Sequence, residues 1–223
     1  MMPAVAEAPP TRREARKQDR RQAILDAARE SFLEKGFAGT SMSGLLDTLG
    51  GSKATLWSYF RSKEELFAAV LDDAVIEHRT ALLACIEPTG DLVDSLTRFC
   101  RRFLEKLSSP ASLALWRLVA AESGRNPAIG QIFYERAPRH IEAGLTAFIA
   151  THMALGELRT GDPIEAARML ISLCTGRQHR ILWGVATADP AEVEKDADLT
   201  VALFLRAYRA DGSEPLPADP RAT

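Results

Sequence analysis

The apolar positions of the first third of the chain recur with helical spacing. Ile24, Ala28 and Phe32 follow one another at intervals of four, which predicts a buried helical face within a helix over about residues 13–35. Two shorter helical patterns come next, over residues 40–49 and from residue 52, and a pair of glycines separates them. Glycine readily adopts the left-handed backbone that ends a helix. The pattern therefore predicts two short helices joined by a tight turn.

The rest of the chain is also helical in pattern, and prolines and glycines mark its breaks. A longer helix is expected to start near Ser62, and the last helix is expected to end at about Tyr208. No alternating pattern is long enough for a strand, and no internal repeat occurs, so the predicted fold class is all-α. The expected breaks are Pro88–Asp91, Pro110, Asn126–Pro127, Pro138, Gly156–Pro163 and Ala188–Pro190.

Two short helices around a glycine turn are typical of a helix-turn-helix, whose second helix enters a DNA major groove. Ser52 is a candidate N-cap of that second helix, and Lys53, Ala54 and Thr55 would follow on its first turn. A lysine there can donate to guanine, and a methyl group can contact a thymine methyl. Lys63 stands at the start of the next helix, where a phosphate can bind.

Residues 36–63 resemble the DNA-binding domain of the TetR/AcrR family of bacterial transcriptional regulators, with no gap in the spacing. The matching positions are Gly36, Phe37, Thr40, Ser41, Gly50, Ser52, Thr55, Leu56, Tyr59, Phe60, Ser62 and Lys63. Gly51 departs from the family pattern because it replaces a buried valine, which loosens the turn. Ala54 and Trp57 also depart from the pattern, where glycine and tyrosine are usual.

The resemblance implies an N-terminal three-helix domain over residues 12–62 that binds double-stranded DNA at an inverted-repeat operator. The residues expected to contact DNA are Thr40, Ser41, Ser43, Ser52, Lys53, Ala54, Thr55, Trp57, Tyr59 and Lys63.

The charge is distributed unevenly along the chain. Residues 1–63 carry eleven Lys and Arg against seven Asp and Glu, whereas the remaining residues carry seventeen against twenty-three. A basic excess beside the predicted helix-turn-helix favours attraction to phosphate. Part of it is a cluster ahead of the first helix that is either a flexible, solvated tail or an arm that contacts DNA: Arg12, Arg13, Arg16, Lys17, Arg20 and Arg21.

The C-terminal part resembles the ligand-binding domain of AefR-like members of the same family. The matching segments are 117–122, Pro127, Phe133–Tyr134, 156–159 and 163–176. The resemblance implies a ligand-binding and dimerisation domain over residues 63–210, between polar tails at 1–11 and 211–223 that are expected to be disordered. It also implies a homodimer in which the helices at about 163–184 and 191–208 meet their two-fold mates.

The last helix supports a dimer independently, because its apolar surface is broad. The alternative is that the core of one chain uses all of this apolar surface. The residues expected at the interface are Ile164, Ile171, Val193, Val201, Phe204 and Tyr208.

An inducer pocket is implied inside the C-terminal domain. Its candidates are aromatic or polar residues on otherwise apolar helices, for which ordinary core packing is the alternative. They are Phe99, Phe103, Trp116, Phe133, Tyr134, His140, Arg177, His179 and Trp183. No metal or cofactor is expected, because the four histidines lack metal spacing and no complete phosphate loop occurs.

The three cysteines are expected to be buried free thiols in a reducing cytoplasm, and no apolar run is long enough to span a membrane. The function implied by the resemblance is that of a ligand-responsive regulator, most simply a repressor released from a palindromic operator by a small molecule. An activator stays open. So do a helical enzyme and a helical binding module without operator binding.

Overall fold

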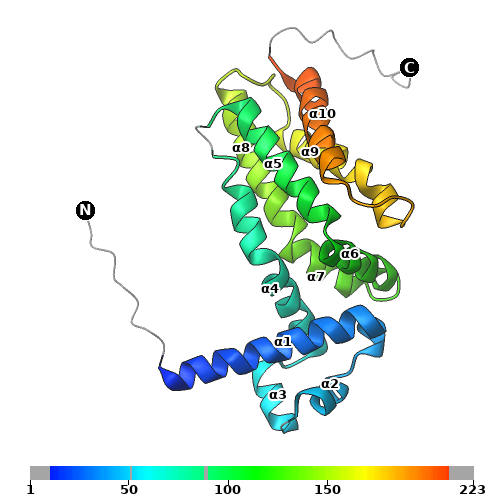
Figure 1. Cartoon of the computed structure of the whole chain (residues 1–223). Coiled ribbons are helices and arrows are strands. Elements are labelled where there is room, and N and C mark those ends of the chain that lie inside the picture. The colour runs from blue at the N-terminus through cyan, green and yellow to red at the C-terminus, as the bar shows by residue number, and fades with distance from the viewer. Residues whose placement is uncertain (1–10, 51, 88–89, 211–223) are drawn as a thin grey trace, which may run out of the picture. The chain divides into compact units, whose positions relative to one another are not determined.

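The computed structural model describes residues 11–50, 52–87 and 90–210, except the side chains of Glu77 and Arg177. These residues form ten α-helices and an isolated bridge between Leu158 and Arg209, so the all-α prediction is confirmed (Figure 1). The helices are α1 (Arg12–Gly39), α2 (Met42–Leu49), α3 (Lys53–Tyr59), α4 (Lys63–Leu83), α5 (Leu92–Ser108), α6 (Pro110–Ser123), α7 (Pro127–Arg136), α8 (Pro138–Ala154), α9 (Pro163–Leu182) and α10 (Pro190–Tyr208).

The chain divides into two compact units, one up to Asp73 and one from Ala74, so the division falls within α4. The predicted domain boundary lies earlier, at the start of that helix. The predicted disordered tails lie outside the described residues, apart from Thr11, which caps α1. No described helix is both long and apolar enough to cross a membrane.

Local sequence sets where the helices of the second unit begin. Each of α6 to α10 starts with a proline, which lacks the N–H that a first helical turn would leave unpaired. A polar side chain before four of these five helices accepts a hydrogen bond from a backbone N–H of the first turn. These N-caps are Ser109, Asn126, Asp162 and Asp189.

The core of the first unit is built around three aromatic rings. The centroids of Phe32, Phe37 and Phe67 lie 5.2–5.6 Å apart, in stacked and edge-to-face pairs. Gly36 has φ +73°, which bends the end of α1 and is favourable for glycine. Because α1 bends there, Phe37 can pack back onto Phe32 of the same helix.

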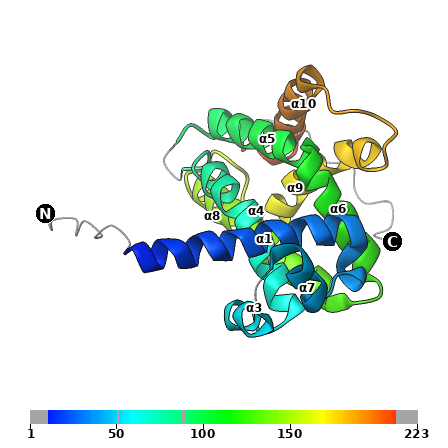
Figure 2. The ribbon, with the colours of Figure 1, turned by 60° about the horizontal axis from the view of Figure 1, so that its bottom comes forward.

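The core of the second unit lies between α5, α8, α9 and α10, with the end of α4. α10 packs on α5 and α9, and α9 also packs on α8, an arrangement that can be followed in Figures 1 and 2. A buried amide connects two of these helices, because Gln178 Nε2 donates to Leu104 O at 3.0 Å and to Ser108 Oγ at 2.9 Å. These contacts fix the α9–α5 register.

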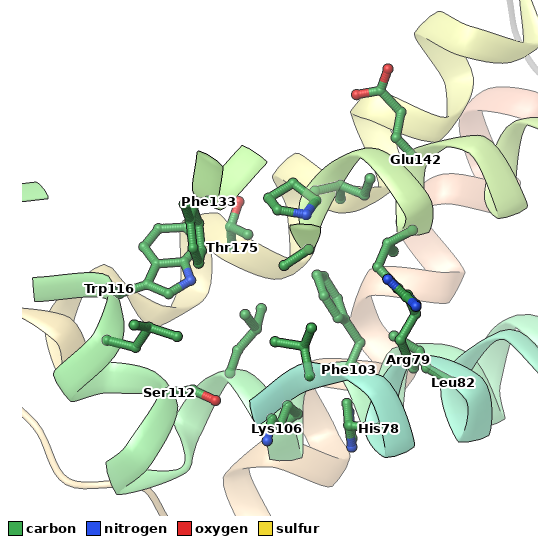
Figure 3. A pocket seen from close by; sticks show the side chains of 17 residues that line it. His78, Arg79, Leu82, Phe103, Lys106, Ser112, Trp116, Phe133, Glu142 and Thr175 are labelled. Atoms are coloured by element: carbon green, nitrogen blue, oxygen red, sulfur yellow. The ribbon is translucent and has the colours of Figure 1, made fainter. Parts of the chain in front are cut away.

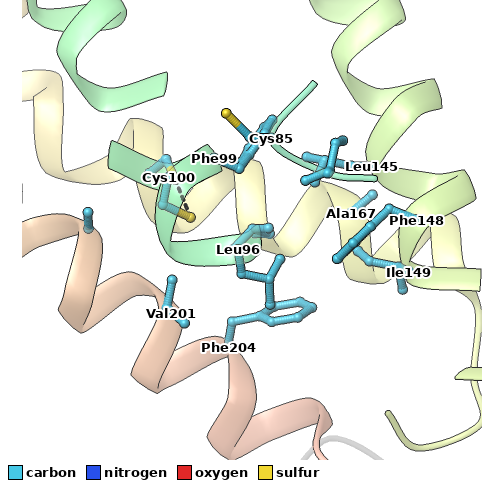
Figure 4. Close-up of a cluster of buried hydrophobic side chains, with 14 of the residues drawn as sticks. Cys85, Leu96, Phe99, Cys100, Leu145, Phe148, Ile149, Ala167, Val201 and Phe204 are labelled. Atoms are coloured by element: carbon cyan, nitrogen blue, oxygen red, sulfur yellow. Dashed lines mark hydrogen bonds between the residues drawn. The ribbon is translucent and has the colours of Figure 1, made fainter. Parts of the chain in front are cut away.

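The three cysteines are buried and free, as predicted. The thiols of Cys100 and Cys174 lie 3.9 Å apart in the core (Figure 4). The hydrogen bond from Cys174, together with burial, raises the pKa of Cys100 well above its ordinary value. A thiol with such a pKa stays protonated and is a poor nucleophile.

Candidate nucleic-acid interface and ligand cavity

Local capping orients the two short helices around the turn. Ser41 accepts a hydrogen bond from Gly44 N at the start of α2, and Ser52 accepts one from Thr55 N at the start of α3. Gly50 ends α2 with φ +62°. The predicted turn at Gly50 is therefore present. Gly51 lies outside the described residues, so the loosening of the turn that was expected from it stays a prediction.

Burial decides which side of each short helix faces outward. Leu45 of α2 and Leu56 of α3 are buried, whereas Leu46 and Leu49 are only partly so. The opposite sides are left in solvent, and most of the residues expected to contact DNA lie there. Ser41, Ser43, Ser52, Lys53, Ala54, Thr55 and Trp57 are exposed, and Tyr59 is half-buried. The first turn of α3 thus presents a cation, two methyl groups and a hydroxyl to solvent.

Arg20 of α1 holds the turn, a role that sequence reasoning missed. Its guanidinium donates to Leu49 O at 3.2 Å and to Gly50 O at 2.5 Å, which pairs carbonyls at the end of α2. The Tyr59 hydroxyl donates to Lys17 O at 3.4 Å, so the end of α3 also contacts α1. α1 is therefore the support on which both short helices are positioned.

The basic cluster is helical from Arg12 onward, because Thr11 and Glu14 cap the start of α1 reciprocally. The alternative of a flexible tail is therefore wrong for residues 12–21, which belong to α1. Arg12, Arg13, Arg16 and Lys17 are exposed on the first turns. Arg20 is occupied at the turn, and the guanidinium of Arg21 lies 5.6 Å from the centre of the Phe60 ring.

Two of the residues predicted to contact DNA have partners within the chain in this structure. Thr40 is buried, and its hydroxyl donates to Gly36 O at 2.9 Å. Lys63 Nζ donates to Phe37 O at 2.8 Å and to Thr40 O at 2.9 Å, and it lies 4.3 Å from the centre of the Phe37 ring. Both side chains therefore close the bent end of α1. Sequence spacing places both residues beside those that face DNA, but it does not predict their hydrogen bonds to these backbone carbonyls.

Replacing Arg20 by Ala is expected to lower the free energy of unfolding by about 1–3 kcal/mol, because two carbonyls lose a charged donor. Urea unfolding measures the change. Arg16→Ala removes the same side chain one turn earlier, where it is exposed, and is expected to change stability by less than about 0.5 kcal/mol. Equal losses in the two variants would contradict the role assigned to Arg20.

The second unit contains a cavity of about 290 Å³ whose walls come from α4 to α9. Most of its lining is apolar, with Val75, Leu82, Ile141 and Ile171 among the aliphatic residues. Trp116 and Phe133 meet edge to face at one side, with ring centres 6.3 Å apart (Figure 3). A concave, mostly apolar cavity with few polar groups is typical of a small-molecule site.

The structure brings only some of the predicted pocket residues together. Phe103, Trp116 and Phe133 line the cavity. Phe99 belongs to the core, whereas Tyr134 and His140 are exposed. His179 and Trp183 are exposed and stack on each other at 5.5 Å, and the side chain of Arg177 lies outside those described. The prediction missed the polar lining, which includes His78, Arg79, Lys106, Ser112, Glu142 and Thr175.

Burial lowers the pKa of His78, and the positive charges of Lys106 and Arg102 lower it further. The imidazole is therefore neutral at pH 7. Its Nε2 is buried and has no hydrogen-bond partner among the described residues. A protonated imidazole would carry a buried N–H at this nitrogen without an acceptor, which makes protonation unfavourable in the folded state.

Stability is therefore expected to fall as the pH drops below about 6.5, where the unfolded chain binds the His78 proton first. His78→Gln removes this titration, so its unfolding free energy should change less between pH 7.5 and pH 5.5 than that of the natural protein. Urea unfolding at both pH values measures the difference. Parallel pH profiles would contradict a lowered pKa for His78.

Two family descriptions match the chain. Residues 24–70 match the bacterial regulatory proteins of the tetR family, and residues 94–210 match the C-terminal domain of AefR-like transcriptional repressors. The second match alone covers more than half of the 223 residues. The chain belongs to the TetR family of bacterial regulatory proteins. The resemblance expected from residues 36–63 is confirmed, and the protein is a DNA-binding transcriptional regulator.

Individual TetR-family proteins are similar over most of the chain. The Flavonoid-responsive Regulator FrrA is 30% identical, with a TM-score of 0.74 over 87% of this chain and 100% of that chain. A TetR-family regulator from Mesorhizobium loti is 28% identical, with a TM-score of 0.75 over 87% and 98%. The transcriptional repressor ComR of Escherichia coli K12 is 31% identical over 62% of this chain and 67% of its own length.

The predicted dimer contacts of this TetR-family chain need a correction. Val193, Val201 and Phe204 are buried in the core of a single chain, where Figure 4 shows Val201 and Phe204 directed toward Leu96. Ile171 lines the cavity, and Tyr208 stacks on Phe204 with 4.8 Å between ring centres. Val193, Val201 and Phe204 therefore have no surface left for a partner chain, whereas Ile171 and Tyr208 are half-buried. Of the predicted set, only Ile164 is well exposed.

Proposed function

We propose that the protein is a homodimeric repressor that binds an inverted-repeat operator in the cytoplasm and is released when a small molecule enters the cavity. The exposed first turn of α3, held by the Ser52 cap and by Arg20, is the observation that carries this proposal. The relatives support it, because ComR is named a repressor and FrrA is named flavonoid-responsive.

In this proposal α3 is the recognition helix. Lys53 donates to a guanine, and the methyl groups of Ala54 and Thr55 meet thymine methyls. Arg12, Arg13, Arg16 and Lys17 contact phosphates, which gives affinity without sequence preference. Two such helices in a dimer enter successive major grooves about 34–36 Å apart.

The dimer surface proposed here is the exposed side of α9 and α10. Leu199 and Leu203 of α10 are each 43% exposed, and Met169 of α9 is 48% exposed. Ser172 and Gly176 continue the α9 side with small residues, which let a partner helix approach closely. α9 and α10 pack on each other within one chain, so a two-fold mate would complete a four-helix bundle.

The effector acts by favouring a dimer state in which the two recognition helices no longer fit the operator. Its effect on the operator affinity is bounded by its differential affinity for the two states. The cavity lies wholly within the second unit, since its lining residues run from Val75 to Thr175.

Lys53→Ala is expected to cost about 1–3 kcal/mol of binding free energy at one position of each half-site and to relax the base preference there. Arg16→Ala is the matched control, because losing a phosphate contact weakens binding to every sequence alike and makes the salt dependence shallower by about one phosphate. Fluorescence anisotropy with an operator and its single-base variants separates the two patterns. A uniform loss for Lys53→Ala would make that lysine a phosphate contact instead.

A further inference from the structure

The charges around the cavity are unequal. Arg79 and Lys106 contribute positive groups to the lining, and Glu142 contributes a carboxylate. The Glu142 carboxylate accepts a hydrogen bond from Arg168 at 3.3 Å, a bond that raises the pKa of Arg168. Figure 3 shows this carboxylate directed away from the other lining side chains. The lining therefore includes two cations, while its carboxylate is already paired with Arg168.

The two cations have donors to spare. Arg79 Nη1 donates to Arg136 O at 3.3 Å, and Lys106 Nζ donates to Ala74 O at 3.4 Å. Within the described part of the chain neither has a carboxylate partner. A guanidinium has five N–H donors and an ammonium has three, so most of these donors are left for an acceptor. A negatively charged or acidic oxygen satisfies such donors best.

The cavity is also divided by chemistry. Trp116 of α6 and Phe133 of α7 form an aromatic side, and Figure 3 places Arg79 across the cavity from them. Arg79 and Lys106 come from α4 and α5. An aromatic ring packs well against an edge-to-face pair, while a charged group is poorly placed there. A ligand with one aromatic end and one acidic end matches this division.

We propose that the effector is an aromatic molecule with one acidic oxygen group, a carboxylate or a phenol. Its ring packs against Trp116 and Phe133, and its acidic oxygen accepts hydrogen bonds from Arg79 and Lys106. The proposal rests on the cavity being the effector site. It excludes a lipophilic cation, since the same two groups repel a positive charge. The positive charge of Lys106 contributes, after burial, to the lowered pKa of His78.

The test is calorimetric titration of the full-length protein, without DNA, with four naphthalene probes: 2-naphthoate, 2-naphthol, 2-naphthalenemethanol and 2-naphthylmethylammonium. The carboxylate or the phenol is expected to bind at least about tenfold more tightly than the ammonium. Which of the two acids binds better identifies the form of the acidic group. An ammonium that binds as tightly as both acids would overturn the proposal.

Two variants test whether Arg79 and Lys106 bind the acidic group of the probe. Lys106→Met and Arg79→Met should each lower the affinity for the more tightly bound acid by about tenfold. Neither variant should change the affinity for 2-naphthalenemethanol. Arg102→Met is the matched control, because it removes a cation of α5 that does not line the cavity, and it should change neither affinity. Thermal melting verifies that each variant is folded. Acid binding that is insensitive to both Lys106→Met and Arg79→Met overturns the proposal.

A parallel operator-binding assay separates this proposal from the proposed function. If the natural protein binds its operator while none of the acids binds the cavity, the effector class is wrong and the DNA-binding function stands. If the acids bind as described but leave the operator complex intact, the ligand chemistry of the cavity stands. The claim that a ligand in this cavity releases the protein from its operator is then contradicted.

Discussion

Phe204→Glu is expected to unfold the second unit. Phe204 is 0% exposed and lies in the core with Leu96, so the new carboxylate would be buried without a partner (Figure 4). Loss of a buried phenylalanine alone costs about 3–5 kcal/mol, and an unpaired buried charge adds to this. Because a domain is stable by only about 5–15 kcal/mol, most of the stability would be lost.

Circular dichroism and urea unfolding measure this effect. The conservative control is Phe204→Leu, which keeps the position apolar and should cost far less than Phe204→Glu. A Phe204→Glu protein that melts like the natural one would show that this side chain is not in the core. A folded Phe204→Glu variant that no longer dimerises would show that Phe204 lies at the dimer interface, as its sequence pattern predicted.

Leu203→Glu is expected to have the opposite outcome, although it is the adjacent position. Leu203 is 43% exposed on α10, so the glutamate would remain in solvent in a single chain. In the proposed dimer it would face the two-fold mate, where two buried like charges are strongly unfavourable. The variant should therefore stay helical but sediment as a monomer.

Operator affinity should fall by orders of magnitude in Leu203→Glu, because a monomer covers only one half-site. Analytical ultracentrifugation and anisotropy on the same preparation test both consequences. Val93→Glu is the control, because it places the same charge at an exposed apolar position of α5 rather than on the proposed α9–α10 surface. If Leu203→Glu sediments as a dimer and binds DNA normally, the interface lies on another surface.

Most of the fold could be predicted because its signals are local. Proline at a first helical turn and an Asp, Ser or Asn before it mark helix starts within a few residues of sequence, as at Ser109–Pro110 and Asp189–Pro190. The Ser41 and Ser52 caps and the left-handed Gly50 are equally local. The helix-turn-helix and its exposed first turn followed from them.

The errors concern contacts between residues far apart in sequence. Thr40 and Lys63 carried the family spacing, but the carbonyls of Gly36 and Phe37 that hold them could not be read from that spacing. The apolar stripe of α10 fits a core and a partner chain equally well, because periodicity shows a buried side and not what covers it. The polar cavity residues Arg79 and Lys106 look like solvated surface in sequence.

The central claim is that α3 reads a specific inverted repeat, and selection from a random duplex DNA library tests it most directly. The natural protein is predicted to enrich two half-sites in opposite orientation, with centres one helical turn or a multiple of it apart. Lys53→Ala should enrich a site with a relaxed position in each half. If the natural protein enriches no sequence at low salt, where binding is strongest, the account of α3 as a recognition helix is contradicted.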